Sequence, residues 1–222
     1  RFAGYHTVTD ALNTYVHRYL APQGDDRRTL LLLHGTGGDE NDLIQLGQML
    51  APDAGLLSPR GTVSENGAAR FFRRHAEGVL DIPDLHARTK ELVAWIGAAA
   101  AKYGFDATKI VAAGFSNGAN IATSIMLSSP ETLSGAILFR PMVPFIPESP
   151  ISLADKRVFI GAGESDTLVP KTHPDRLAEL LRVLGADVTL KWQPTGHALT
   201  RADVSAAYEW MEAGREDAAS RE

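Results

Sequence analysis

The stretch that decides the fold is KIVAAGFSNGANIA, residues 109–122, in which Gly114, Ser116 and Gly118 form the pattern Gly-x-Ser-x-Gly. The apolar run that opens it predicts a buried strand, and a helix is expected to begin directly after the serine. Ser116 would then lie on a sharp strand-to-helix turn, where a serine hydroxyl projects outward and can act as a nucleophile. Glycine suits both flanking positions because the backbone is crowded there. The alternative is a serine that merely caps the helix.

Strands and helices alternate along the rest of the chain. Short apolar runs predict strands of a parallel sheet that is buried on both faces, and these lie at 15–20, 29–33, 54–58, 109–113, 135–139, 157–160 and 188–192. Apolar residues spaced three or four apart predict helices, at 84–103, 117–127, 175–184 and 202–211. We therefore expect a single α/β domain over residues 1–222, with a mostly parallel central sheet, helices on both faces and no large lid domain. The polar end, 215–222, is expected to fray.

Composition narrows the function classes. The net charge of −5 over 222 residues argues against a nucleic-acid partner, which would need a basic stripe. No run of about 18 apolar residues is present, so no membrane span is expected. The absence of cysteine removes disulfides, thiolate metal sites and a cysteine nucleophile, and it fits a cytoplasmic protein.

A serine nucleophile needs a base, and the base needs an acid that orients it. In α/β-hydrolases these follow the serine in the order acid, then histidine. Asp166 lies just beyond the strand expected at 157–160, and Glu164 is the rival acid. His197 follows the strand expected at 188–192 and is the predicted base, whereas His173 precedes a proline and is expected to open a helix.

The glycine-rich stretch LLHGTGGDEND, residues 32–42, is expected to turn close to Ser116. The backbone N–H groups of Thr36 and Asn117 are the predicted donors of an oxyanion hole. A phosphate-binding loop would need Gly-Lys-Ser/Thr, which is absent. A metal site built from His34 and the acidic residues of this stretch is possible by residue type, but a solvated acidic turn is the favoured interpretation, with His34 structural.

Two stretches are candidates for a substrate pocket. Phe71 and Phe72 either line an acyl site or are simply buried, and the arginines that follow them would favour an acidic substrate. Residues 140–150 carry proline at every third position, which suits either a polyproline ligand for a partner domain or an apolar segment over the pocket. The pocket residues expected from these stretches and from the loop after Asp166 are Phe71, Phe72, Met142, Val143, Leu168 and Val169.

Four motifs, LLLLHGTGG, AAGFSNGANIA, GESDTLVP and TGHAL, resemble the phospholipase/carboxylesterase family of α/β-hydrolases, which includes acyl-protein thioesterases and small bacterial carboxylesterases. The resemblance runs from about residue 29 to 213. It implies a Ser116–Asp166–His197 triad, oxyanion donors at Thr36 and Asn117, and ester or thioester hydrolysis through an acyl-enzyme, with no metal and no cofactor.

The sequence thus predicts a serine hydrolase that acts on small-molecule esters of small to medium acyl size, and it leaves a homodimer open. Two alternatives remain at this point. One is a ligand-binding protein without catalysis on the same fold, and the other is amide or peracid chemistry on the same triad.

Overall fold

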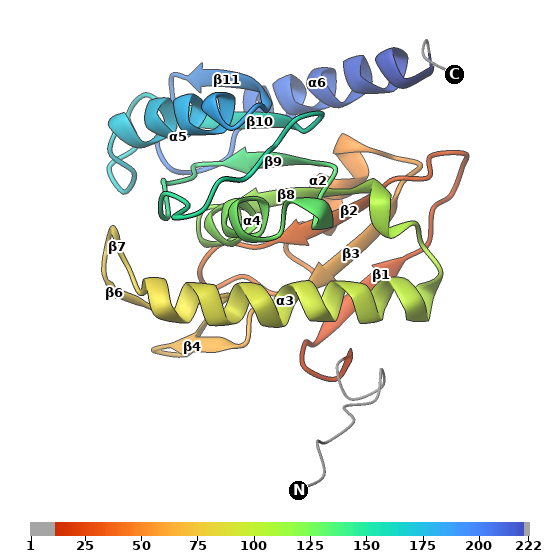
Figure 1. Cartoon of the computed structure of the whole chain (residues 1–222), viewed down its shortest axis with the longest axis horizontal. Helices are drawn as coiled ribbons and strands as arrows, with labels where there is room; N and C mark the ends of the chain where they lie inside the picture. Colours follow the sequence, from red (N-terminus) through yellow and green to blue (C-terminus); the bar gives the residue numbers. More distant parts are fainter. Residues whose placement is uncertain (1–11, 220–222) are drawn as a thin grey trace, which may run out of the picture.

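The computed structural model describes residues 12–219, and its centre is a seven-stranded sheet in the order β1-β3-β2-β8-β9-β10-β11 (Figure 1). The strands are β1 (His17–Leu20), β2 (Thr29–Leu33), β3 (Gly55–Pro59), β8 (Ile110–Phe115), β9 (Gly135–Phe139), β10 (Arg157–Gly163) and β11 (Asp187–Gln193). Strand β1 pairs antiparallel with β3, and every other pairing in this sheet is parallel. The carboxyl ends of β2 and β8–β11 therefore meet at one edge.

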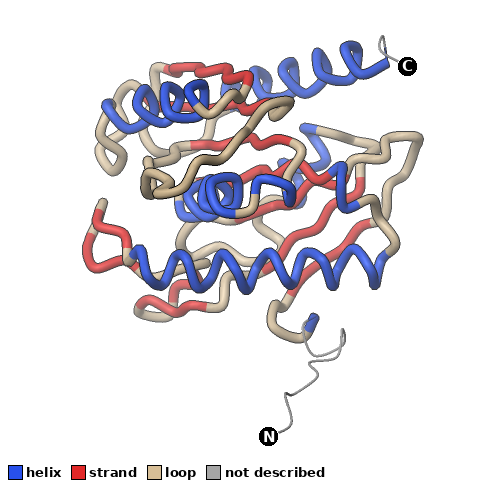
Figure 2. Tube along the Cα trace, in the orientation of Figure 1, coloured by secondary structure: helices blue, strands red, loops and turns tan. Residues whose placement is uncertain are grey.

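Helices cover both faces of the sheet (Figure 2). They are α2 (Ile44–Leu50), α3 (Ile82–Tyr103), α4 (Asn117–Ser128), α5 (Thr172–Val183) and α6 (Arg201–Ala219), with short 3-10 turns η1 (Ala107–Lys109) and η2 (Pro130–Thr132). Buried residues of α3, α4 and α5 form one hydrophobic cluster with the sheet, and those of α2 and α6 form a second. This arrangement confirms the expected mostly parallel sheet with helices on both faces.

Strand β2 shows why the sequence folds in this way. All five of its residues are buried. Leu31 and Leu33 belong to the cluster under α3 and α4, whereas Leu30 and Leu32 belong to the cluster under α2 and α6. Because side chains alternate between the faces of a strand, only an uninterrupted apolar run can satisfy both faces. Burying each leucine contributes about 1.5–3 kcal/mol.

The ends of α3 follow from local chemistry. The Asp81 side chain accepts a hydrogen bond from the Asp84 N–H at the start of the helix, and Pro83 occupies its first turn, where a missing N–H costs nothing. Gly104 ends the helix in the left-handed conformation, with φ of 74°.

The segment between β3 and α3 differs from the sequence-based expectation. It contains two short hairpins, β4 (Val63–Glu65) with β5 (Ala68–Arg70), and β6 (Arg74–Ala76) with β7 (Val79–Leu80). Their turns place Asn66, Gly67 and Gly78 at positive φ. These strands are two or three residues long and mix apolar with polar residues, so they are too short to show an alternation that a pattern search could detect.

Two helices also differ from expectation. Helix α2 has only seven residues and was not predicted. Helix α6 runs to Ala219, so it continues into the stretch that was expected to fray, and residues 220–222 lie outside the described part. Within residues 12–219, none of the helices combines the length and the apolar character needed to cross a membrane.

The turn between β8 and α4 is closely packed against β2. A Cβ atom at Gly118 would lie 1.9 Å from the Leu33 carbonyl oxygen and 2.7 Å from that of His34. Both neighbours are backbone atoms, so they cannot move aside as a flexible side chain would. Gly97, in α3, offers a contrast because a Cβ there would meet nothing within 4 Å.

We expect Gly118→Ala to destabilise the protein by several kcal/mol, because the new methyl group overlaps the β2 backbone. This cost exceeds the about 1–3 kcal/mol usual for overpacking, since the backbone atoms cannot move aside. Gly97→Ala is the matched control and should raise the free energy of unfolding by about 0.5–1 kcal/mol, as expected for an open helix position. Urea unfolding of both variants measures the difference. Equal stability of Gly118→Ala and wild type would contradict the packing described.

Candidate active site

Ser116 lies at the turn between β8 and α4 in a strained conformation. Its φ is 52° and its ψ is −111°, in a region that residues with a side chain rarely adopt. The backbone N–H of Ser116 donates to the Phe139 carbonyl at 2.9 Å. Its hydroxyl makes no capping hydrogen bond to α4, and Oγ lies 3.0 Å from His197 Nε2 instead. The helix-cap interpretation of this serine is therefore not supported.

His197 connects Ser116 to Asp166. Its Nδ1 lies 2.8 Å from Asp166 Oδ2, so with the proton on Nδ1 the ring donates to the carboxylate and Nε2 accepts from the Ser116 hydroxyl. The other oxygen, Asp166 Oδ1, accepts the N–H groups of Leu168 and Val169 at 2.8 and 3.0 Å. The Asp166 side chain is only 2% exposed, and these bonds fix its orientation.

The rival residues lie elsewhere. Glu164 is exposed, and its contact with the base loop is a backbone bond from its N–H to the Gln193 carbonyl. His173 Nδ1 accepts the Val143 N–H at 3.1 Å. Of the two acids and two histidines considered, the structure brings Asp166 and His197 together with Ser116.

The loops that carry Asp166 and His197 are bonded to each other, because β10 and β11 are neighbours. The Ser165 N–H donates to the Thr195 carbonyl at 2.9 Å. The chains approach so closely that a Cβ at Gly163 would lie 2.3 Å from the Gly196 oxygen. The relative position of acid and base is therefore set by backbone contacts.

Thr36 and Asn117 lie beside Ser116, and both line the same cavity. Among the described residues, neither backbone N–H has a hydrogen-bond acceptor, as an oxyanion hole requires. The Asn117 side chain has a separate contact, since its Oδ1 accepts the Phe71 N–H at 2.8 Å. Asn117 thereby ties the start of α4 to the segment between the two hairpins.

His34 holds the glycine-rich loop in place. Its Nε2 accepts the Gly61 N–H at 2.9 Å, so the proton lies on Nδ1, which donates to the Gly35 carbonyl at 2.6 Å. The pKa of His34 lies below its usual value because burial disfavours the charged ring. Both nitrogens are thus occupied, and nearby Glu40 pairs with Arg60; the structural interpretation of His34 holds over the metal site.

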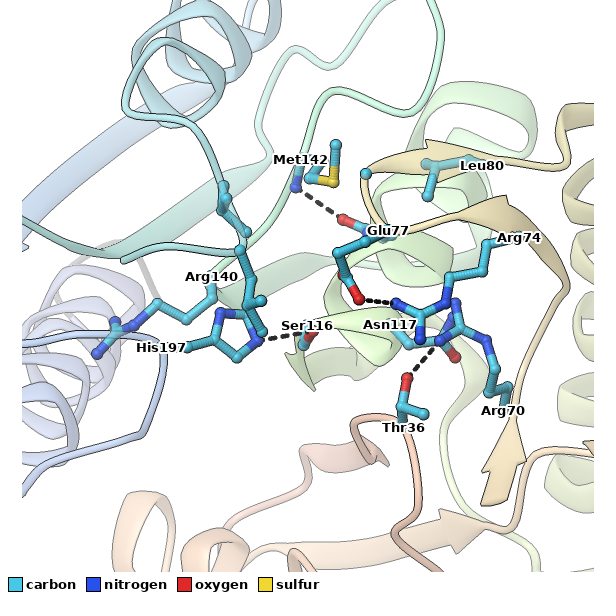
Figure 3. Close-up of a pocket in the computed structure, with 14 residues that line it drawn as sticks. Thr36, Arg70, Arg74, Glu77, Leu80, Ser116, Asn117, Arg140, Met142 and His197 are labelled. Carbon is cyan, nitrogen blue, oxygen red and sulfur yellow. Dashed lines mark hydrogen bonds and ion pairs between the residues drawn. The ribbon is translucent and has the colours of Figure 1, made fainter. Parts of the chain in front are cut away.

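The cavity beside Ser116 contains only part of the expected pocket (Figure 3). Met142, Leu168 and Val169 line it. Phe71 and Phe72 do not, because both rings are completely buried in the core under α3. Val143 is also absent from the lining and packs against the same core. The expectation that these three residues line the pocket was wrong, since the chain turns their side chains inward.

Several residues of this cavity were not singled out from the sequence. They are Arg70, Glu77, Leu80, Asn120 and Arg140, and they lie there together with Arg74. Arg70, Glu77 and Leu80 belong to the two hairpins and Arg140 to the loop after β9, where no motif marks them, whereas Asn120 lies in α4 within the motif AAGFSNGANIA. Arg73 is different, because its side chain is 61% exposed and pairs with Asp81 and Asp84.

Arg140 anchors the loop that carries His197. Its guanidinium donates to the carbonyls of Gly196 and Ala198, at 3.1 and 3.0 Å, on either side of the histidine. It also forms a two-pronged ion pair with Asp203, with both bonds at 2.8 Å and both side chains completely buried. Arg140 itself has φ of 55°. These contacts link the end of β9 to the start of α6 through the base loop.

We expect Asp203→Leu to lower the free energy of unfolding by about 3–5 kcal/mol, because it leaves the Arg140 charge buried without its partner. The double variant Arg140→Met/Asp203→Leu should regain part of this loss. Glu212→Gln is the surface control, because it removes the exposed ion pair between Glu212 and Arg215. It should lower the free energy of unfolding by at most about 1 kcal/mol. Urea unfolding measures all three, and a cost for Asp203→Leu no larger than that of the surface control would refute the role of the pair.

The lowered pKa of His34 makes stability depend on pH. Unfolding restores the usual pKa of about 6.5, so the unfolded chain takes up the proton first as the pH falls. The contribution of neutral His34 is complete above about pH 7 and is lost progressively below about pH 6.5. We therefore expect the free energy of unfolding to fall as the pH is lowered from about 7 through about 6.5, the pKa of the unfolded state.

His34→Gln should reduce this fall, because glutamine can still accept the Gly61 N–H but does not titrate. The exposed His75 provides the control, and His75→Gln should keep the wild-type dependence. Urea titrations at a series of pH values measure the slope. The same slope in wild type and His34→Gln would contradict the assignment.

A mostly parallel sheet with a serine, an aspartate and a histidine at the carboxyl ends of β8, β10 and β11 defines the α/β-hydrolase fold. Comparison with known proteins agrees. The family model described as Phospholipase/Carboxylesterase matches residues 81–214. The chain belongs to the phospholipase/carboxylesterase family, and this membership supports an ester hydrolase activity.

Individual relatives match over most of their length. MhqD of Bacillus subtilis (strain 168) is 45% identical over 193 residues, which cover 87% of this chain and 96% of MhqD. The crystal structure of the Bacillus cereus carboxylesterase is 44% identical, with a TM-score of 0.87, covering 89% of this chain and 93% of that chain. The structure of YahD with malic acid is 32% identical, with a TM-score of 0.85 and coverage of 89% and 98%.

Proposed function

We propose that this protein is a serine carboxylesterase that hydrolyses small esters through an acyl-enzyme on Ser116. The observation that carries the proposal is the hydrogen-bonded series Ser116–His197–Asp166, with distances of 3.0 and 2.8 Å. Membership of the phospholipase/carboxylesterase family supports it. A serine hydroxyl is a weak nucleophile alone, and this series supplies the base and the acid that orients it.

The first half of the reaction forms the acyl-enzyme. Ser116 Oγ attacks the carbonyl carbon of the ester while His197 Nε2 takes the hydroxyl proton. Asp166 stabilises the imidazolium that results, because its carboxylate accepts the Nδ1–H and is itself held by two backbone N–H groups. His197 then gives the proton to the departing alcohol oxygen, and the acyl group remains on Ser116.

The second half releases the acid. Water loses a proton to His197 Nε2 and attacks the acyl carbonyl, and the proton then passes to Ser116 Oγ as the acyl bond breaks. In both halves a negative oxygen forms, and the N–H groups of Thr36 and Asn117 are the proposed donors to it. One such donor is worth about 10²–10³-fold in rate. The N-terminus of α4, which begins at Asn117, adds a favourable dipole.

Small substrates are the best supported. The cavity beside Ser116 has a volume of about 30 Å³, which holds little more than water. Val169 and Leu80 give one part of its lining an apolar character. The structure of the relative YahD is with malic acid, a small molecule, which also favours small substrates. Thioesters share the same reactive carbon, so the proposal extends to them; comparing a matched ester, thioester and anilide tests that extension.

Incubation with a fluorophosphonate should add one covalent mass to Ser116, because Oγ displaces fluoride from phosphorus. Ser116→Ala should abolish this labelling and lower ester hydrolysis by roughly 10⁴–10⁶-fold. The exposed Ser128, at the other end of α4, provides the control, and Ser128→Ala should keep both properties. Intact-protein mass spectrometry and a pH-stat assay are the measurements. Folded wild-type protein that neither labels nor hydrolyses a panel of acyl esters would refute the proposal.

A further inference from the structure

Two arginines line the cavity beside Ser116, and the proposed mechanism uses neither. Arg70 comes from β5 and Arg74 from β6. Figure 3 shows their guanidinium groups on the opposite side of Ser116 from His197. Arg70 is only 3% exposed, and a cation at such depth is costly unless anions or other acceptors compensate it.

The two guanidinium groups share one acidic partner. Glu65, on β4, lies 3.2 Å from Arg70 Nε and accepts from Arg74 Nε at 3.0 Å. Arg70 Nη1 donates to the Thr36 hydroxyl at 2.5 Å, so this arginine also contacts the proposed oxyanion loop. Among the described residues, Nη2 of neither Arg70 nor Arg74 has an acceptor. Both groups therefore keep unused donors.

Glu77 supplies the second negative charge of this cluster. Its carboxylate accepts from Arg74 Nη1 and lines the same cavity, yet the side chain is 56% exposed. It comes from the turn between β6 and β7, beside Gly78. The Glu77 carboxylate therefore occupies a donor of Arg74 that faces the same cavity as Ser116. Once Glu77 leaves, Arg70, Arg74 and Glu65 carry a net charge of +1.

We propose that Arg70 and Arg74 form an anion subsite that selects esters carrying a free carboxylate, and that Glu77 occupies this subsite until the substrate carboxylate replaces it. This inference rests on the proposed esterase function and names the substrate class. Guanidinium groups suit the role because their planar donors match a carboxylate in a two-pronged arrangement.

Once Glu77 is displaced, the charges of the cluster favour an added anion. Burial, followed by the nearby charge of Arg74, lowers the pKa of Arg70, so this cation is under-compensated. Burial acts in the same direction on Arg74, but Glu65 and Glu77 outweigh it and raise the pKa of Arg74, so Arg74 depends on carboxylate partners. Asn117 also lines the cavity, and its buried Nδ2 has no acceptor among the described residues. A neutral acyl chain that displaces water from the two guanidinium groups would offer their free donors no acceptor, at a cost in affinity.

The test compares matched esters with and without the carboxylate. In the first pair, monoethyl succinate carries the charge on the acid side of the ester, and ethyl butyrate is its neutral counterpart. In the second pair, O-acetylglycolate carries the charge on the alcohol side, and propyl acetate is its neutral counterpart. We expect kcat/KM to favour the charged ester about 10- to 100-fold in one of the two pairs, the range for hydrogen bonds to a charged group. The ratio within a pair is the readout, since general damage to the enzyme lowers both rates and cancels.

Four variants examine the assignment. Arg70→Gln and Arg74→Gln should bring the ratio close to one, and Arg70→Lys should retain part of the preference. Glu77→Gln should raise the ratio severalfold by lowering KM for the charged ester, because the competing carboxylate is gone. Arg73→Gln is the control, since Arg73 lies outside the cavity, and it should keep the wild-type ratio.

The outcomes are distinct. Hydrolysis of charged and neutral esters at equal kcat/KM in both pairs would overturn the subsite and leave the esterase function standing, as would a wild-type ratio in both Arg→Gln variants. Absence of fluorophosphonate labelling and of any turnover would instead overturn the esterase function. In that case calorimetric binding of monoethyl succinate decides: binding to wild type that Arg74→Gln abolishes supports the subsite, and no binding overturns it.

Discussion

The turn between β8 and α4 is the constraint on which the rest of the site depends. It holds Ser116 at a positive φ, a conformation that costs about 1–3 kcal/mol and persists only where the surroundings enforce it. The enforcement comes from packing, because Gly118 lies against the Leu33 carbonyl and Gly114 lies against the first turn of α4. The same contact brings the end of β2 next to the serine. The strained turn and the Thr36 loop are therefore positioned by one backbone approach.

Sheet order explains why residues distant in sequence meet at this turn. Strands β8, β9, β10 and β11 are consecutive neighbours and all parallel, so the loops at their carboxyl ends carry Ser116, Arg140, Asp166 and His197 at the same edge of the sheet. Backbone bonds join the loops after β10 and β11, and Arg140 joins the loop after β9 to the His197 loop. Because the ion pair with Asp203 is completely buried, this link is rigid and independent of solvent.

The sheet and the Ser116, Asp166 and His197 positions could be predicted because each depends on a local pattern. Strand β2 is buried on both faces, so its sequence is an unbroken apolar run. The turn between β8 and α4 needs glycine at two fixed positions. Residues 60–80 could not be predicted in the same way. The aromatic pair Phe71 and Phe72 fits a pocket wall and a core equally well, since hydrophobicity does not indicate which way a side chain turns. Arg140 and Asp203 are 63 residues apart, and the sequence around neither residue indicates that the two form an ion pair.

The correction at Phe71 and Phe72 changes the meaning of the hairpin segment. Two fully buried rings act as anchors for the residues around them, and the Phe71 N–H and the Phe72 carbonyl bond to Asn117 and Arg70. Arg70 is thus fixed from both ends, by the backbone of this segment and by Thr36. A cation that is already held in place loses little conformational freedom when an anion binds. The β6–β7 turn, by contrast, carries Glu77 on a side chain that is more than half exposed and is held by a bond to Arg74. A fixed cation next to an exposed carboxylate is the arrangement that the proposed selection of small esters by their charge requires.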